Sequence, residues 1–396
     1  MIHRFLLVAG LAGIMGPLAL QAADFSSEHS KKKKKEDRPG DWCECLQEMG
    51  VLYDVKKKKN PYVQKVEIFG RYQQQWIYSD GSDQGRDFSG HGQELRRFRI
   101  GASVEFFDRW KIHGRINLED GGFNDTVVRH DNFDELIIRY ESKDFLFFNE
   151  PTIGYGLTKI DFGGEWYTTS KEIKTVERSN LSNLYSPNRA TGFFFAAEVE
   201  DFDVVVGVFS SREHNYALAD WDGGRGYFAS IRTKIGKGKL RADILYVDAT
   251  EEEDEIFGFD WATSLSYDKK VGDWNLFVNG TYGRFDAGDI YGIVVMPSTF
   301  LIEERLEAVF RYQWANSTGM QLRPGSRTHT SVRSVAEADG IRIARGDQNH
   351  SIYAGLNYHF CEDNLKLMTG VEYETLTGRV TDTEATTLWG ALRFFF

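Results

Sequence analysis

Apolar and polar residues alternate with a period of two along most of the chain from residue 63 to its carboxyl end. The segments FRIGASVEF and WKIHGRINL, within 94–107 and 109–120, place apolar residues at every second position and mostly charged or small residues between them. This alternation predicts β-strands with one apolar and one polar face. The expected strands are about twice the usual ~5–6 residues, a length typical of tilted strands that cross a bilayer.

The same pattern predicts sixteen strands, and their connections alternate between long and short. Long loops on one side and tight turns on the other are typical of an outer-membrane barrel. We therefore predict an all-β fold for 63–396, a transmembrane antiparallel β-barrel of about sixteen strands with short periplasmic turns and long extracellular loops. The expected strands are 64–78, 94–107, 109–120, 132–141, 145–160, 190–200, 203–211, 225–236, 238–249, 256–268, 272–284, 290–301, 304–315, 348–360, 364–376 and 386–396. The expected long loops are 79–93, 121–131, 161–189, 212–224, 250–255, 285–289, 316–347 and 377–385.

Composition excludes two other classes of protein. Only 41% of the residues are hydrophobic, and no apolar run after residue 20 is long enough for a membrane-spanning helix. The net charge is −11, and both lysine runs lie in the first 59 residues, so the remainder is more acidic still. An acidic body does not suit a nucleic-acid binder, which needs a basic face for phosphate contacts.

The amino terminus has the layout of an export signal. Arg4 precedes an apolar stretch, and the small residues Ala22 and Ala23 follow it, so 1–23 is predicted to be a signal peptide. Residues 24–62 form a separate, periplasmic, Lys-rich segment with the runs Lys31–Lys35 and Lys56–Lys59 around a stretch with room for one short helical turn. The lysines suit either a tether to an anionic partner or a solvated linker, and like-charge repulsion favours the linker.

The chain has three cysteines, Cys43, Cys45 and Cys361. In an oxidising compartment one disulfide and one leftover thiol are possible by any of three pairings. A lone Cys-x-Cys does not make a structural zinc site, which usually needs four ligands, so no metal and no cofactor are expected. No recognisable motif for a nucleophile or a metalloprotease occurs, and no catalytic residue is assigned.

Several segments resemble the phosphate-selective porin O and P family. They are RRFRIGASVEFFDRWKIHGRINLED at 96–120, DELIIRY at 134–140, TIGYGLTKIDFG at 152–163 and VERSNLSNLYSPNRATGFFF at 176–195, together with the final LRFFF. The resemblance implies a sixteen-stranded, usually trimeric porin in the outer membrane of a Gram-negative-type bacterium, with a polar pore for small anions. Family members tend to have a basic-aromatic stretch where TIGYGLTKI stands, and here only Lys159 is basic.

A barrel of sixteen strands is wide enough for an aqueous channel, so function depends on the side chains that line it. Basic residues at inward positions would favour anions, and acidic ones would favour cations. The alternative is that these charges pair across neighbouring strands. The candidate anion path consists of Arg71, Arg97, Arg99, Lys111, Arg115, Lys159, Arg178 and Arg189.

The long loop 161–189 is the expected constriction, because it is long and carries Arg178 and Arg189. The alternative is a solvated external loop. The arginines of 316–347 would attract anions to the mouth of the channel. The expected function is passive diffusion of small hydrophilic solutes, with small anions among them. The expected partners are outer-membrane lipid, lipopolysaccharide and two further copies of the chain in a homotrimer. The alternative is a barrel enzyme of lipase or protease type with a site at the rim.

Overall fold

The structure, a computed structural model, describes residues 42–55, 60–120, 122–125, 127–212, 221, 223–249, 254, 256–325 and 329–396. The predicted signal peptide and both lysine runs lie outside these residues. No helix of the described chain is both long and apolar enough to cross a membrane.

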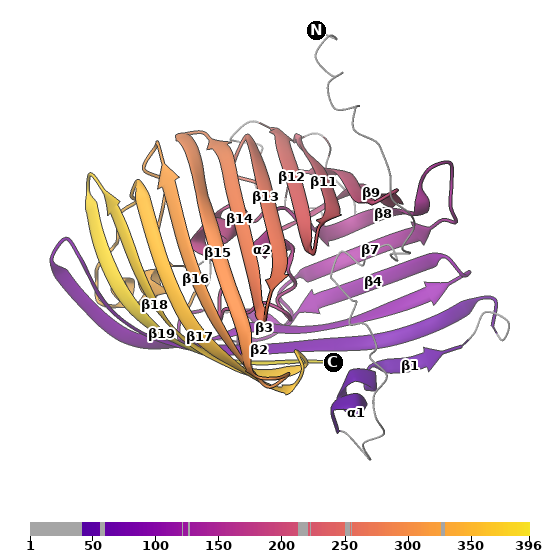
Figure 1. The fold of residues 1–396 in the computed structure, drawn as a ribbon, viewed down its shortest axis with the longest axis horizontal. Helices are drawn as coiled ribbons and strands as arrows, with labels where there is room; N and C mark the ends of the chain where they lie inside the picture. Colours follow the sequence, from indigo (N-terminus) through magenta and orange to yellow (C-terminus); the bar gives the residue numbers. More distant parts are fainter. Residues whose placement is uncertain are drawn as a thin grey trace, which may run out of the picture.

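Sixteen long strands of the described chain form one closed antiparallel barrel (Figure 1). Each strand pairs with its neighbours in sequence, and β19 pairs with β2 to close the barrel. The predicted fold class and strand number are therefore confirmed. The strands are β2 (Val63–Asp83), β3 (Arg86–Phe106), β4 (Trp110–Asn117), β7 (Phe133–Glu141), β8 (Asn149–Lys159), β9 (Arg189–Val199), β10 (Phe202–Ser210), β11 (Arg225–Ile235), β12 (Gly238–Asp248), β13 (Trp261–Val271), β14 (Trp274–Phe285), β15 (Gly288–Ile302), β16 (Leu306–Ser317), β17 (Gln348–Cys361), β18 (Leu365–Gly378) and β19 (Thr381–Phe395).

Three of the predicted long loops are wrong. Most of 79–93 belongs to β2 and β3, which meet at the two-residue turn Gln84-Gly85. Both turn residues have positive φ, 52° and 74°, as a tight turn between twisted strands requires. In the same way, 285–289 and 377–385 are mostly strand, with two-residue turns at 286–287 and 379–380.

The remaining long connections contain short elements. They hold β5 (Glu119–Asp120) and β6 (Val127–Val128), α2 (Gly164–Tyr167) and α3 (Asn180–Leu184), and α4 (Val332–Ala338). The caps of α3 and α4 are Ser179 and Ser331, whose side chains accept hydrogen bonds from backbone amides in the first turn. A serine at this position satisfies an amide that has no partner inside the helix.

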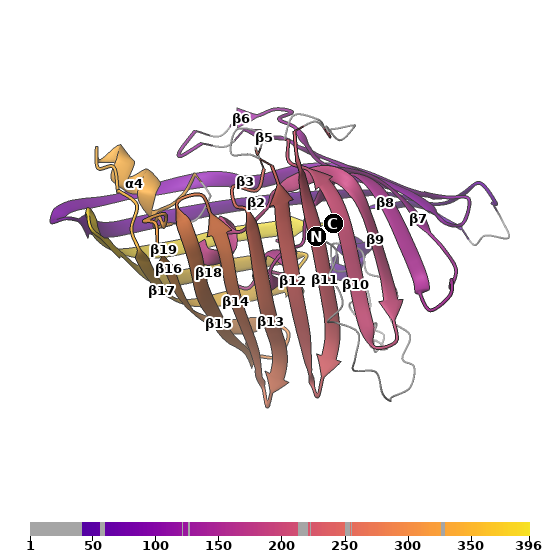
Figure 2. The same cartoon turned by 90° about the horizontal axis from the view of Figure 1, so that it is seen from above.

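The connection with β5 and β6 covers an exposed edge of the barrel wall. β4 ends at Asn117, so the first half of β3 has no partner strand on that side. There Leu118 N donates to Phe98 O at 2.7 Å, and Asn124 N donates to Gln93 O at 3.2 Å. Figure 2 shows β5 and β6 beside β3. The loop thereby satisfies backbone groups that would otherwise form an open sheet edge.

Residues 42–55 pack against the barrel, which differs from the separate segment expected for 24–62. They form α1 (Trp42–Glu48) and β1 (Val51–Asp54), and β1 pairs with β2. A disulfide joins Cys43 in α1 to Cys361 at the end of β17, with the Cα atoms 5.3 Å apart. Of the three pairings open from sequence, the structure has this one.

We expect that Cys43→Ser lowers the temperature at which the barrel unfolds. The disulfide closes a loop with a sequence separation of 318 residues. Closing so long a loop lowers the entropy of the unfolded chain, which destabilises the unfolded state by about 5–6 kcal/mol. The measurement is the temperature at which the folded band converts to the unfolded band on a non-reducing gel. Cys45→Ser is the matched control, and equal transitions for the two variants would contradict the expectation.

Candidate functional site

The charged faces of the first barrel strands point into the lumen. Arg97 and Arg99 on β3 are buried. Ile100, which follows Arg99 and faces the opposite way, is 42% exposed on the outer face. On β4, Arg115 is buried and Ile112 is exposed. The alternation of the sequence therefore has the expected direction, with apolar residues toward lipid and charges inward.

The connection from β8 to β9, residues 160–188, folds into the lumen. It contacts inward side chains on widely separated strands. Ser170 Oγ accepts from Arg71 of β2 at 2.5 Å, and Gly163 N donates to Asp243 of β12 at 3.0 Å. Farther around the wall, Leu181 N donates to Gln313 of β16 at 3.0 Å. The loop thus crosses the barrel interior, and the alternative of a solvated external loop is wrong for this segment.

Buried basic residues on the last barrel strands hold the backbone of this loop. Arg393 of β19 donates to Ser170 O at 3.3 Å and to Val176 O. Lys366 of β18 donates to Ile173 O at 3.1 Å. Loop carbonyls inside a barrel need partners, and these long cations supply them.

Arg311 of β16 adds a third anchor. Its guanidinium donates to Glu177 O and to Glu372 Oε1, both at 2.7 Å. Glu177 itself pairs with Arg96 of β3 at 2.8 Å. Burial raises the pKa of Glu177, but Arg96, Arg97 and Arg393 outweigh this effect and hold its pKa below the ordinary value. Glu177 therefore joins two strands through the loop: its ionised carboxylate pairs with Arg96 of β3, and its backbone carbonyl accepts from Arg311 of β16.

Cations also stack on the aromatic residues of α2, near the start of the loop. The Trp166 ring lies 5.4 Å from Lys159 Nζ and 4.9 Å from the Arg178 guanidinium. Tyr167 lies between Arg232 and Arg241, at 5.0 and 4.2 Å. Such contacts stabilise the ring position by about 0.5–2 kcal/mol each. They fix α2 against the β8–β12 side of the lumen.

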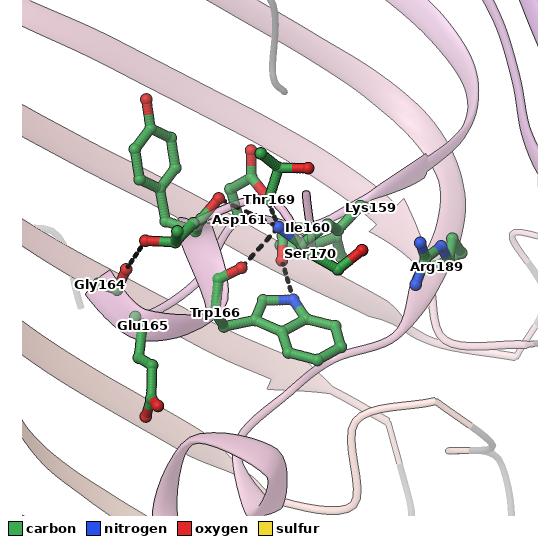
Figure 3. Close-up of polar contacts among 12 residues, drawn as sticks. Lys159, Ile160, Asp161, Gly164, Glu165, Trp166, Thr169, Ser170 and Arg189 are labelled. Atoms are coloured by element: carbon green, nitrogen blue, oxygen red, sulfur yellow. Dashed lines mark hydrogen bonds and ion pairs between the residues drawn. The ribbon is translucent and has the colours of Figure 1, made fainter. Parts of the chain in front are cut away.

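Two of the predicted path residues, Lys159 and Arg178, donate hydrogen bonds to backbone carbonyls of the loop. Figure 3 shows Lys159 beside Asp161 and the Trp166 carbonyl; the Nζ distances are 2.7 and 2.6 Å. Arg178 donates to the carbonyls of Glu165 and Thr168. Burial lowers the pKa of Arg178 to about 10, although nearby Glu165 and Glu177 raise it. Both groups are cations with backbone partners.

Apolar packing fills part of the lumen around the loop. Phe162, Leu181 and Tyr185 of the loop pack with inward residues such as Phe259 and Phe285. A second cluster joins the loop, α4 and the wall of β17–β19 and β2; its members include Val176, Val332, Val335, Tyr353 and Trp389. The wall of β2–β4 and β7–β9 carries most of the predicted path residues.

On that wall, three of the predicted arginines surround one aspartate. Arg99 Nη2 lies 3.0 Å and Arg189 Nη2 lies 2.8 Å from Asp134 Oδ1. Arg115 contacts both Asp134 and Glu135, the latter at 3.0 Å. All three arginines therefore pair with carboxylates of β7, Arg115 from the neighbouring strand β4 and Arg99 and Arg189 from the next strands beyond β4 and β8.

Arg71 and Arg97 differ, because their hydrogen-bond partners are neutral. Arg71 donates to the Ser170 hydroxyl, and Arg97 donates to Gln73 Oε1 at 2.8 Å. Neither forms an ion pair within the described chain. The buried Nε atoms of Arg71 and Arg189 have no hydrogen-bond partner among the described atoms. These donors point to a place for water or for an anion.

Lys111 lies apart from this group. It is four residues from Arg115 along β4, toward the short-turn side, and its Nζ pairs with Glu105 at 3.5 Å. The loop and the arginine wall therefore bring together Arg71, Arg97, Arg99, Arg115 and Arg189, but not Lys111.

Two β-bulges supply charges that strict alternation assigns to the outer face. In β3 the register shifts opposite Gln73 and Gln74, so Arg96 turns inward beside Arg97. In β7 the shift opposite Arg115 and Ile116 turns Asp134 inward beside Glu135. Each bulge places two successive residues opposite one partner. Within the described chain no group of three or more metal-binding side chains occurs.

Comparison with known proteins agrees with this geometry. The sequence model of the family described as phosphate-selective porin O and P matches residues 66–252. No curated protein sequence matches the chain significantly.

Solved structures share the fold at low sequence identity. OprB of Pseudomonas putida has a TM-score of 0.57 at 12% identity, over 84% of this chain and 94% of that chain. OmpF of Salmonella typhi, solved in complex with daunomycin, has 0.53 at 13%, over 87% and 100%. The outer-membrane channel DcaP of Acinetobacter baumannii has 0.52 at 14%, over 87% and 100%.

The resemblance seen in the sequence is therefore confirmed over 66–252 by the family model, and the whole barrel has the fold of outer-membrane porins. The chain is thus an outer-membrane porin by its fold, and its residues 66–252 match the model of the phosphate-selective porin O and P family.

Proposed function

We propose that this porin prefers small anions and conducts them along the wall formed by β2–β4 and β9. The observation that carries the proposal is the environment of Arg71 and Arg97, two buried guanidinium groups with neutral partners. A guanidinium cannot lose its proton at physiological pH, and its planar donors match carboxylate and phosphate oxygens. The phosphate in the family's description makes this ion the natural probe.

The balance of charge on the wall supports the same preference. Asp134 and Glu135 serve Arg99, Arg115 and Arg189. Glu177, the nearest loop carboxylate with an ion pair, is held by Arg96. Burying an uncompensated charge is costly, so a wet lumen in which water or a passing anion solvates Arg71 and Arg97 is the arrangement that stabilises them.

The inward loop 160–188 is proposed as the constriction. It crosses the lumen, and its Ser170 Oγ accepts a hydrogen bond from Arg71. The loop would thereby bring a passing anion close to the arginine wall, where the attraction between opposite charges is strongest. Three basic anchors, Arg311, Lys366 and Arg393, keep it there.

Reconstitution in a planar bilayer tests the anion preference. We expect the reversal potential under a KCl gradient to show a preference for chloride, and we expect added phosphate to reduce the chloride current. A preference for potassium would overturn the proposal and leave the porin assignment intact.

The double variant Arg71→Gln/Arg97→Gln is expected to move the reversal potential toward that of a non-selective pore. It is also expected to raise the phosphate concentration for half-block about tenfold or more. A hydrogen bond to a charged group contributes about 1.5–3 kcal/mol, and each 1.4 kcal/mol is a factor of ten. Lys237→Gln removes a positive charge from the exposed turn between β11 and β12 and is the matched control. Equal effects of both changes would exclude a local role for the arginines.

Arg393→Gln is expected to loosen the loop and increase the fluctuations of the single-channel current. The shorter side chain leaves Val176 O or Ser170 O without its partner, which costs about 1–3 kcal/mol per buried group. Single-channel recording at constant voltage measures the effect, with Lys237→Gln again as control. An unchanged noise spectrum in a folded variant would show that the loop does not depend on this anchor.

We also propose a homotrimer and a channel without enzymatic activity. Both rest on the family resemblance, and the comparisons give the barrel enzyme no support. We expect native mass spectrometry of the detergent-solubilised protein to give three times the mass of the mature chain. A dominant monomer over a range of detergents would contradict the trimer.

A further inference from the structure

The helix α1 packs on the outer surface of the barrel. Its buried residues Cys43 and Leu46 form a small cluster with Leu365, Phe394 and Phe396. Leu365 and Phe394 are paired across β18 and β19. The residue next to Phe394, Arg393, points into the lumen, so Phe394 and its partner face outward, as successive side chains of a strand alternate.

The strand β1 then continues the barrel wall where β19 ends. Phe396 exchanges backbone hydrogen bonds with Gly70 of β2, and directly beyond it Ile68 N donates to Gly50 O at 2.8 Å. Tyr53 pairs with Val66. The whole segment 42–55 therefore lies at the rim that bears the carboxyl end of the chain and the turns 107–109 and 362–364 (Figure 1).

This segment exposes large apolar side chains. Trp42, Met49 and Leu52 are 53%, 56% and 61% exposed. In α1, Trp42 lies next to the buried stripe of Cys43 and Leu46, while Glu44 and Glu48 lie on the far side of the helix. Met49 follows directly after the helix. A cluster of this kind on an otherwise acidic segment marks an interaction surface.

We propose that α1 and β1 form an interfacial anchor whose apolar flank enters the headgroup region of the periplasmic leaflet. The partner is the phospholipid surface beside the barrel seam between β19 and β2. Trp, Tyr and Met beside a lipid-facing wall suit this depth, because aromatic residues concentrate at membrane–water interfaces and short amphipathic segments lie in the interface plane.

Continuity with the lipid-facing girdle favours lipid over a second protein copy. Next to the anchor, Tyr62 contacts Phe107 with ring centroids 6.3 Å apart, and Phe106 contacts Trp110 at 6.4 Å. These aromatics belong to the ends of β2, β3 and β4 at the same rim. The disulfide and the cluster with Phe394 fix the anchor to the wall, so the barrel insertion itself brings it to the bilayer surface.

The test uses the full-length porin reconstituted in vesicles of phosphatidylethanolamine and phosphatidylglycerol, with bromine atoms on the acyl chains near the headgroups. Bromine quenches tryptophan emission only at short range. The emission of Trp42 is the difference between the emission of the unchanged protein and that of Trp42→Phe. We expect bromine to quench almost all of this emission. Two matched variants calibrate the measurement: Trp274→Phe removes a lipid-exposed tryptophan of β14, and Trp166→Phe removes a tryptophan buried in the lumen.

Two outcomes would overturn the proposal. If Trp42 emission resists bromine but is quenched by acrylamide, the segment faces water. If it resists both, protein covers it, and the surface is an interface with a second copy. Leu52→Asp provides a second readout: we expect it to shift Trp42 emission to longer wavelength and to reduce its bromine quenching, with chloride conductance unchanged. An unaltered Trp42 signal in this variant would also overturn the anchor.

Discussion

The structure depends on one constraint: within hydrocarbon, every backbone amide and carbonyl needs a partner from the chain itself. Pairing of β19 with β2 meets it by closing the wall. Where pairing stops short, other segments complete it. β1 takes over along β2 beyond Phe396, and the β4–β7 connection covers the free half of β3. Both additions keep the sheet without an open edge at the places where neighbouring strands differ in length.

Closure also decides where charge can go. Lipid accepts only the apolar face of each strand, so the inward face receives nearly all charged residues of the wall. Inside the lumen these charges divide into two groups. Arg311, Lys366 and Arg393 donate to carbonyls of the inward loop and act as structural cations. Arg71 and Arg97 have only neutral hydrogen-bond partners, and the proposed function assigns them to solutes. The same residue type thus holds the loop on β16 and β19 and, in the function proposed above, serves passing anions on β2 and β3.

Sequence periodicity predicted the sixteen strands because each crosses the bilayer with one apolar face. It failed for 79–93, where Gly, Ser and Asp replace the apolar positions. This part of the β2–β3 hairpin has no lipid to face, so nothing selects an apolar alternation, and the strand continues through backbone pairing alone. The inward position of 160–188 could be suspected from its length, but its partners lie on β2, β12 and β16–β19, and no local pattern encodes contacts at that separation.

The site itself shows why a register argument gives most, but not all, of a channel lining. Strict alternation assigns Arg97 and Glu135 to the lumen and sends Arg96 and Asp134 to lipid. Two bulges reverse the latter pair, because one extra residue moves a side chain to the opposite face. Both added charges form ion pairs: Arg96 pairs with Glu177, and Asp134 pairs with three arginines. The bulge in β3 therefore links the wall to the loop, and the bulge in β7 links strands of the wall to one another. Neither added charge forms an ion pair with Arg71 or Arg97 among the described residues.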